Sequence, residues 1–212
     1  MLKRFILSLF PRAFRPKEYD PKQHWTNFGL IYKKRYHRRF ERNLKAGDDM
    51  NVRLLSDYVE KLAPKSVLDI GCGYGLYVKA FEDRFPLLHV EGCDISPTQL
   101  DEARTFLGPN TRVFLKESEP YKLPYKDKEF DLAITYGVCL YLPHDKIDGF
   151  INEIARVTKR HYLFIENSRG DDGYSYTNHD YPAVFQRLGI PLTIERELIP
   201  AIKERLYLAT FE

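Results

Sequence analysis

Residues 67–75 read Val-Leu-Asp-Ile-Gly-Cys-Gly-Tyr-Gly, a short apolar run that ends in three alternating glycines. Residues 66–70 have the apolar content of a short buried strand, and a helical pattern follows over 75–85. Glycine permits the tight turn that joins them and lets a ligand approach the backbone closely. Because open α/β sheets bind ligands at the carboxyl ends of their strands, we expect this loop to form part of a binding site.

The spacing of these glycines and the residues that follow them differ from those of two common phosphate-binding loops. A dinucleotide fingerprint requires glycine at position 76, which is Leu76, and no Gly-Lys-Ser/Thr follows as in a P-loop. Asp69 stands two residues before the first glycine, where a carboxylate suits a cationic group better than a pyrophosphate. The helix beyond Gly75 would offer free N–H groups to an anion.

Strands alternate with helices on both sides of this loop. We expect strands at 66–70, 87–94, 112–115, 130–135 and 161–166, and helices at 49–62, 75–85, from Pro97, 145–157 and 181–188. Two further strands, 192–198 and 205–211, have no helix between them and predict an antiparallel C-terminal edge hairpin. The sequence therefore predicts an α/β fold: a Rossmann-like, mostly parallel seven-stranded sheet with helices on both faces. We divide the chain into an N-terminal extension (1–48) and a domain (49–212).

The composition is that of a folded protein. Among 212 residues, 43% are apolar and 30% are charged, which excludes a disordered or collagen-like chain. No apolar run approaches the ~20 residues of a membrane span. Cys72, Cys93 and Cys139 are too few and too scattered for a disulfide framework and lack the pairing of a zinc site. We expect apolar packing for these thiols, no bound metal, and a cytoplasmic protein.

Charge is distributed unevenly along the chain. Residues 1–45 contain 13 Lys or Arg and three Asp or Glu, whereas the remainder contains 20 and 27. The basic segment predicts an anionic partner: a membrane surface, nucleic acid or a phosphorylated substrate. The apolar helical stripe of residues 1–10 fits either a helix packed on the domain or a weak, peripheral membrane anchor. Aromatic residues from Trp25 to Tyr36 fit either a helix covering the sheet or a lid over the site.

A second acidic residue marks the end of the next strand. Residues 90–94 read Val-Glu-Gly-Cys-Asp, and a carboxylate at Asp94 can accept both hydroxyls of a ribose. With these two elements the chain resembles the class I S-adenosylmethionine-dependent methyltransferases, since VLDIGCGYG is similar to their first motif and EGCDIS to their second. Residues 123–132 (LPYKDKEFDL) and 155–159 (ARVTK) resemble later elements in the same order. The resemblance covers about 50–170.

The resemblance implies S-adenosyl-L-methionine as cofactor and S-adenosyl-L-homocysteine as product. It places Asp69 at the methionine part, Asp94 at the ribose, Ile95 at the adenine and Glu119 near the adenine amino group. Tyr136 and Gly137 would lie beside the sulfonium, where Tyr136 could add a cation–π contact. The full implied set is Asp69, Gly71, Cys72, Gly73, Gly75, Asp94, Ile95, Ser96, Glu119, Tyr136 and Gly137.

The residues that would act on the methyl acceptor are less clearly marked. A polar and aromatic segment, 174–181, follows the fifth strand and contains His179 and Asp180, a pair that could serve as general base for O-methylation. A loop whose polar groups are satisfied internally is the other interpretation of His179. Glu166 and Asn167 end the fifth strand, where they are placed to meet a substrate.

Methyl transfer from a sulfonium mainly needs positioning and desolvation, so the acceptor stays open. The segment after the fifth strand looks similar to methylases that act on sugars in surface-glycan pathways. Together with the basic amphipathic N-terminus, this resemblance favours a small-molecule, surface-glycan or glycolipid acceptor. A motif of many base amino-group methylases is absent at 135–138, which read Thr-Tyr-Gly-Val. The basic arm still leaves an RNA or protein methyltransferase as an alternative, and a catalytically inactive partner protein with this fold is a third.

Overall fold

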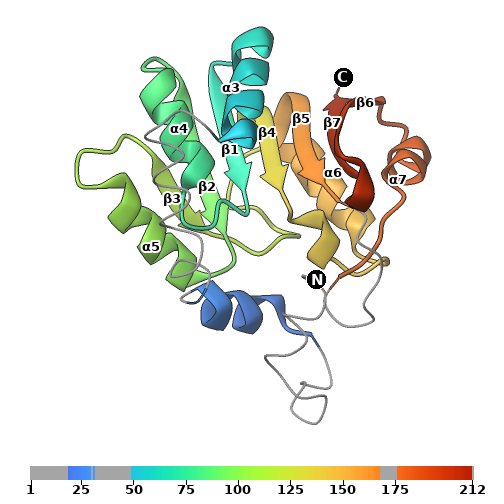
Figure 1. The fold of residues 1–212 in the computed structure, drawn as a ribbon, viewed down its shortest axis with the longest axis horizontal. Coiled ribbons are helices and arrows are strands. Elements are labelled where there is room, and N and C mark those ends of the chain that lie inside the picture. Colours follow the sequence, from blue (N-terminus) through green and yellow to red (C-terminus); the bar gives the residue numbers. More distant parts are fainter. Residues whose placement is uncertain (1–18, 30, 32–48, 168–175, 212) are drawn as a thin grey trace.

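A computed structural model describes residues 19–29, 31, 49–167 and 176–211. Seven strands form one sheet in the order β3-β2-β1-β4-β5-β7-β6 (Figure 1). Neighbouring strands from β3 to β5 are parallel, whereas β7 pairs antiparallel with both β5 and β6. The predicted fold class, with its antiparallel C-terminal hairpin, is confirmed.

The elements lie close to the ranges expected from the sequence. The strands are β1 (Ser66–Ile70), β2 (His89–Asp94), β3 (Phe114–Glu117), β4 (Phe130–Tyr136), β5 (Thr158–Glu166), β6 (Leu192–Ile199) and β7 (Glu204–Thr210). The α-helices are α3 (Met50–Leu62), α4 (Leu76–Arg84), α5 (Pro97–Leu107), α6 (Ile147–Val157) and α7 (Tyr181–Arg187). Two short 3-10 helices are η2 (Cys139–Tyr141) and η3 (Pro200–Ile202).

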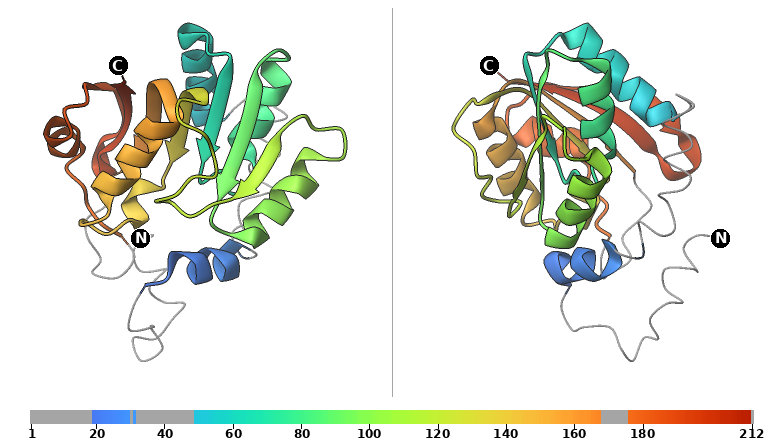
Figure 2. Two further views of the ribbon diagram at one scale, coloured as in Figure 1. Left: turned by 180° about the vertical axis from the view of Figure 1, so that it is seen from behind. Right: turned by 90° about the vertical axis from the view of Figure 1, so that its left-hand side faces the viewer.

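Helices cover both faces of the sheet (Figure 2). Side chains of α3, α4 and α5, such as Leu55 and Phe81, pack on one face and form one apolar core. Side chains of α6 and α7, such as Phe150 and Phe185, pack on the other face and form a second core. The strands of the sheet centre are buried on both sides, which explains their nearly continuous apolar sequence.

The strand boundaries differ from the sequence prediction by up to three residues, and two of the differences have a structural cause. β3 begins at Phe114 rather than at 112, because the Glu82 side chain of α4 accepts the main-chain N–H of Arg112 at 2.5 Å. β5 begins at Thr158 rather than at 161, because α6 runs directly into the strand and Thr158 already pairs with Phe130.

A helical segment at 21–29, hereafter the 21–29 helix, lies beyond the carboxyl ends of the parallel strands (Figure 1). The Lys22 ammonium contacts the Glu117 carboxylate at the end of β3, with an N–O distance of 2.6 Å. This segment therefore belongs to the same edge of the sheet as the glycine loop.

The loop that connects β3 to β4 is held by one arginine of α6. The Arg156 guanidinium donates to the main-chain carbonyls of Leu123 and Tyr125, at 3.1 and 2.8 Å. It also binds the carboxylates of Glu153 and Asp127, and Glu153 in turn accepts the N–H of Leu123 at 2.7 Å. A planar guanidinium suits this set of bonds, which fixes the main chain of the loop beside the buried side chains of Leu123 and Tyr125.

We expect Arg156→Ala to lower the free energy of unfolding by about 1–2 kcal/mol, because two main-chain carbonyls and a part-buried carboxylate lose their partner. Arg104→Ala is the matched control: it removes an exposed pair with Asp101 on α5 and should cost less than about 0.5 kcal/mol. Chemical denaturation of both variants measures the difference. Equal losses would show that the Arg156 bonds add nothing beyond a surface ion pair.

Candidate active site

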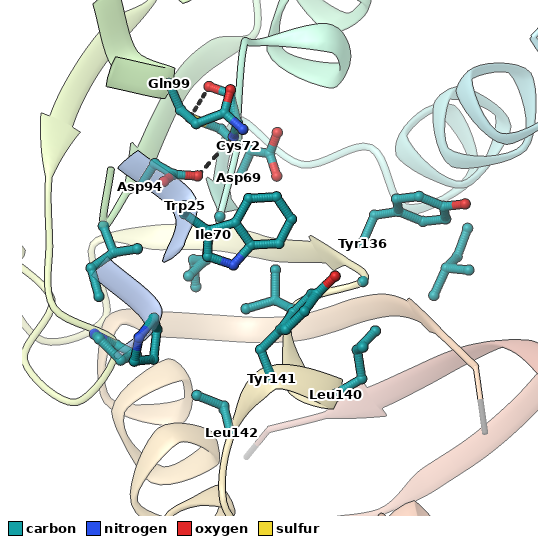
Figure 3. Close-up of a pocket in the computed structure, with 18 of the residues that line it drawn as sticks. Trp25, Asp69, Ile70, Cys72, Asp94, Gln99, Tyr136, Leu140, Tyr141 and Leu142 are labelled. Carbon is teal, nitrogen blue, oxygen red and sulfur yellow. Dashed lines mark hydrogen bonds between the residues drawn. The ribbon is translucent and has the colours of Figure 1, made fainter. Parts of the chain in front are cut away.

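A cavity of about 440 Å³ lies at the carboxyl edge of the parallel strands. Its wall comes from the ends of β1, β2, β4 and β5, from the loops that follow them, and from the 21–29 helix (Figure 3). A volume of this size is typical of small-molecule and cofactor sites. The cavity therefore lies at the edge of the sheet where the sequence predicted a binding site.

The glycine turn after β1 forms one wall of the cavity. The N–H groups of Gly71 and Cys72 both donate to the carbonyl of Cys93, at 2.7 and 3.0 Å, so the turn is tied to β2. Gly71 has a φ of +75°, and a Cβ there would lie 2.5 Å from the Val138 side chain. Glycine is required at this position both by the backbone and by the approach of the loop after β4.

Asp94, at the end of β2, is buried, and its carboxylate is hydrogen-bonded to the glycine turn. Its Oδ2 accepts the N–H of Gly73 at 2.9 Å, and its Oδ1 accepts the N–H of Ser96 at 2.8 Å. Burial raises the pKa of the Asp94 carboxyl to about 6, although these main-chain bonds favour the charged form. Each carboxylate oxygen can accept a second bond, so Asp94 still has capacity for hydroxyl groups of a ligand.

Asp69, at the end of β1, is 1% exposed and lines the same cavity. Its Oδ2 atom has no hydrogen-bond partner among the residues that the structure describes. Burial, together with the negative charge of Asp94, raises the pKa of Asp69 to about 8. Figure 3 shows both carboxylates beside Cys72 on one side of the cavity. Because a buried carboxylate without a partner is unfavourable, this arrangement fits a ligand that carries a positive charge.

Most of the residues implied for cofactor binding line the cavity. They are Asp69, Gly71, Cys72, Gly73, Asp94, Ile95, Tyr136 and Gly137. Three of the implied residues are not part of the lining. Gly75 is the N-cap of α4, Ser96 caps α5 by accepting the N–H of Gln99 at 3.2 Å, and Glu119 is exposed in the loop after β3. The neighbours Ser118 and Pro120 line the cavity instead of Glu119, so the structure does not place Glu119 at a ligand.

The structure places Glu166 next to the loop that follows β4. This residue is 1% exposed and is not among the lining residues. Its Oε1 accepts the N–H groups of Val138 and Cys139, both at 2.8 Å, and burial raises its pKa to about 7. Glu166 therefore holds the loop after β4, whose residues line the cavity, and acts on the site through that loop.

His179 and Asp180 are also placed away from the cavity, which argues against the general base that we predicted. The Nε2–H of His179 points at the carbonyls of Cys139 and Leu142, at 3.1 and 3.0 Å, and burial lowers its pKa. Asp180 is the N-cap of α7 and accepts the N–H of Ala183 at 3.2 Å. Both residues satisfy main-chain groups, which is the other interpretation that the sequence allowed for His179.

Aromatic side chains from the N-terminal segment and from η2 form another wall. The rings of Trp25 and Tyr141 (Figure 3) are perpendicular, with their centroids 5.0 Å apart. The centroid of the Tyr141 ring is 5.3 Å from that of Tyr176. Trp25 and Phe28 of the 21–29 helix line the cavity, as the lid interpretation expects, whereas Tyr32 and Tyr36 lie outside the described residues. The predicted anchor at 1–10 and the basic run at 33–39 also lie outside them.

Several lining residues were missed by sequence reasoning. Gln99 lies in the first turn of α5, so the prediction of a helix opening at Pro97 already placed it at this edge. Tyr77 and Glu204 had no such signal, since Glu204 stands at the start of the last strand rather than at the end of a parallel one. The three cysteines are buried and unpaired, as expected. The described residues contain no helix that could cross a membrane and no cluster of potential metal ligands.

Residues 67–161 match the family model of a methyltransferase domain. Malonyl-[acyl-carrier protein] O-methyltransferase of Legionella pneumophila is 32% identical over 101 residues, which cover 47% of this chain and 35% of that protein. Norajmaline N-methyltransferase of Rauvolfia serpentina is 33% identical over 97 residues, 44% of this chain and 32% of that one. The chain thus spans about a third of the length of these two curated relatives.

Solved methyltransferase structures have the same fold. Magnesium protoporphyrin IX methyltransferase from Synechocystis PCC 6803, solved with bound SAH, superposes with a TM-score of 0.69 at 16% identity. The superposition covers 90% of this chain and 98% of that one. Residues 67–161, which contain the glycine turn, Asp69 and Asp94, are thus similar to a methyltransferase domain, and the chain has the fold of a methyltransferase that was solved with bound SAH.

Proposed function

We propose that this chain transfers the methyl group of S-adenosylmethionine to a small molecule or to a glycan or glycolipid precursor. One observation carries the cofactor half of the proposal: Asp69 and Asp94 are buried side by side at the glycine turn, and Asp69 has an oxygen without a partner among the described residues. The cofactor supplies an electrophilic methyl group on a sulfonium and leaves as a neutral thioether.

The lining residues have distinct roles in this proposal. Asp69 accepts the cationic end of the cofactor, and Asp94 accepts the ribose hydroxyls while it holds Gly73 in place. Tyr136 and Trp25 exclude water from the reacting atoms, and the loop held by Glu166 sets the position of Gly137 and Val138. Positioning and desolvation account for most of the catalysis in such an in-line displacement.

The shape of the cavity supports a small acceptor. The 21–29 helix contributes part of the wall, so the space beside the cofactor residues is bounded by aromatic side chains. An RNA or protein acceptor remains the second candidate because 13 of the first 45 residues are Lys or Arg. Salt-sensitive RNA binding that is lost when the charges at 33–39 are removed would favour the second candidate.

We expect Asp94→Ala to weaken S-adenosylmethionine and S-adenosylhomocysteine binding at least tenfold, because hydrogen bonds to a charged acceptor contribute about 1.5–3 kcal/mol each. Asp101→Ala on the neighbouring helix removes an exposed carboxylate and should leave both affinities unchanged. Calorimetric titration, with melting curves to verify folding, makes the comparison. Unchanged affinity in the folded Asp94 variant would remove the ribose assignment, and no binding by the wild type would favour a catalytically inactive partner protein.

We expect the ligand-free protein to lose stability through Asp69 as the pH rises from about 4 to about 8. The pKa of this carboxyl is raised on folding, so its contribution is fully present below the unfolded pKa and is lost as the pH passes the folded value of about 8. Asp69→Asn should therefore melt higher than the wild type at pH 8.5 but bind S-adenosylhomocysteine more weakly. A melting temperature difference that does not change with pH would contradict this account.

A further inference from the structure

The loop after β4 contacts the glycine turn through the Val138 side chain. A Cβ atom built on Gly71 would lie 2.5 Å from Cγ2 of Val138 and 3.6 Å from its Cβ and Cγ1. A methyl group of Val138 therefore fills the space that a side chain at position 71 would need. Both residues line the cavity, so this contact joins two of its walls.

The glycine turn is held differently on its two sides. Toward β2 it is hydrogen-bonded: the N–H groups of Gly71 and Cys72 donate to the carbonyl of Cys93, and the N–H of Gly73 donates to Asp94. Toward β4 the turn packs against the Val138 side chain. Because protein interiors are close-packed, a displacement of Val138 would open a void into which the turn can move. The position of the turn therefore depends on the position of Val138.

The carboxylate of Glu166 fixes the main chain at Val138. The ladder between β4 and β5 ends with the N–H of Gly137, which donates to the carbonyl of Ile165 at 3.0 Å. The next two N–H groups, of Val138 and Cys139, both donate to Oε1 of Glu166 at 2.8 Å. A side chain thus replaces the strand partner at this point, and without it two N–H groups in the interior would lose their acceptor.

We propose that Glu166 is a positioning residue for the methyl donor: it holds Val138 against Gly71 and thereby sets the glycine turn at the cofactor end of the cavity. This inference rests on the proposed function. Glu166 acts through the loop, since it is 1% exposed and is not among the lining residues. What this role requires is an acceptor atom at the position of Oε1, and Oε2 has no hydrogen-bond partner among the described residues.

The test compares two substitutions of Glu166 in the full chain by calorimetric titration with S-adenosylhomocysteine, at a temperature where melting curves show every variant folded. Glu166→Met keeps the length of the side chain but removes the acceptor, and should weaken binding at least tenfold. Glu166→Gln keeps an oxygen for both N–H groups and should stay within about threefold of the wild type. A side chain that only stabilises the fold would change the melting temperature without this pattern of affinities.

A matched control removes a similar bond elsewhere. Glu153 also accepts a main-chain N–H, that of Leu123 at 2.7 Å, but Leu123 does not line the cavity. Glu153→Met should therefore lower the melting temperature and leave the affinity for S-adenosylhomocysteine unchanged.

A double-mutant cycle tests the route through Val138. Val138→Ala removes the methyl groups that contact Gly71 and should itself weaken binding. When Glu166→Met is added to Val138→Ala, the further loss should be no more than about twofold, because the contact that Glu166 supports is already absent. If Glu166→Met does not fold, Glu166→Asp replaces it in both experiments, since its carboxylate is one methylene too short to keep both bonds.

The outcomes separate this inference from the proposed function. Wild-type protein that binds S-adenosylhomocysteine, with equal affinity in Glu166→Met, overturns the positioning role and leaves the methyltransferase intact. Equal losses in Glu166→Met and Glu166→Gln, or fully additive losses in the cycle with Val138→Ala, also overturn it. Wild-type protein that binds no S-adenosylhomocysteine instead contradicts the proposed function.

Discussion

The site depends on two carboxylates buried at adjacent strand ends. Asp69 and Asp94 come from the parallel strands β1 and β2, and the glycine turn that follows β1 is hydrogen-bonded to β2. Burial, together with the negative charge of Asp94, raises the pKa of Asp69 to about 8. Without a ligand this arrangement is unfavourable, and the fold maintains it through the main-chain bonds that Asp94 accepts from Gly73 and Ser96. A positively charged ligand stabilises the ionised carboxylates. The pair therefore destabilises the ligand-free protein but favours binding of a cation.

Other buried polar side chains position the loops around this pair. Glu166 accepts two N–H groups of the loop after β4, and His179 donates to the carbonyls of Cys139, the first residue of η2, and of Leu142, just after it. When only the sequence was considered, Glu166 was expected to meet the substrate and His179 to act as a general base with Asp180. Their partners are main-chain groups that would otherwise be buried and unsatisfied, so they set the shape of the cavity without entering it.

The sequence predicted the site best where the same short segment both requires a particular backbone conformation and carries the ligand-binding groups. The glycines at 71 and 73, followed by Asp94, predicted the turn and the end of the sheet at which the cavity lies, because a tight turn and a carboxylate at a strand end leave few alternatives. The acceptor end was not predictable in this way. Glu204 and Tyr77 reach the cavity only because β7 inserts antiparallel beside β5 and α4 packs behind β1, and these are tertiary relations that no local pattern contains.

Proton release on cofactor binding tests the central claim most directly. S-adenosylmethionine is titrated at pH 7 by calorimetry in two buffers that differ in ionisation enthalpy, with the wild type and with Asp69→Asn. A pKa of about 8 in the ligand-free protein means that Asp69 is mostly protonated at this pH, so binding of a cation should release nearly one proton from the wild type and none from the variant. Binding without proton release, or the same release from both proteins, would contradict the account.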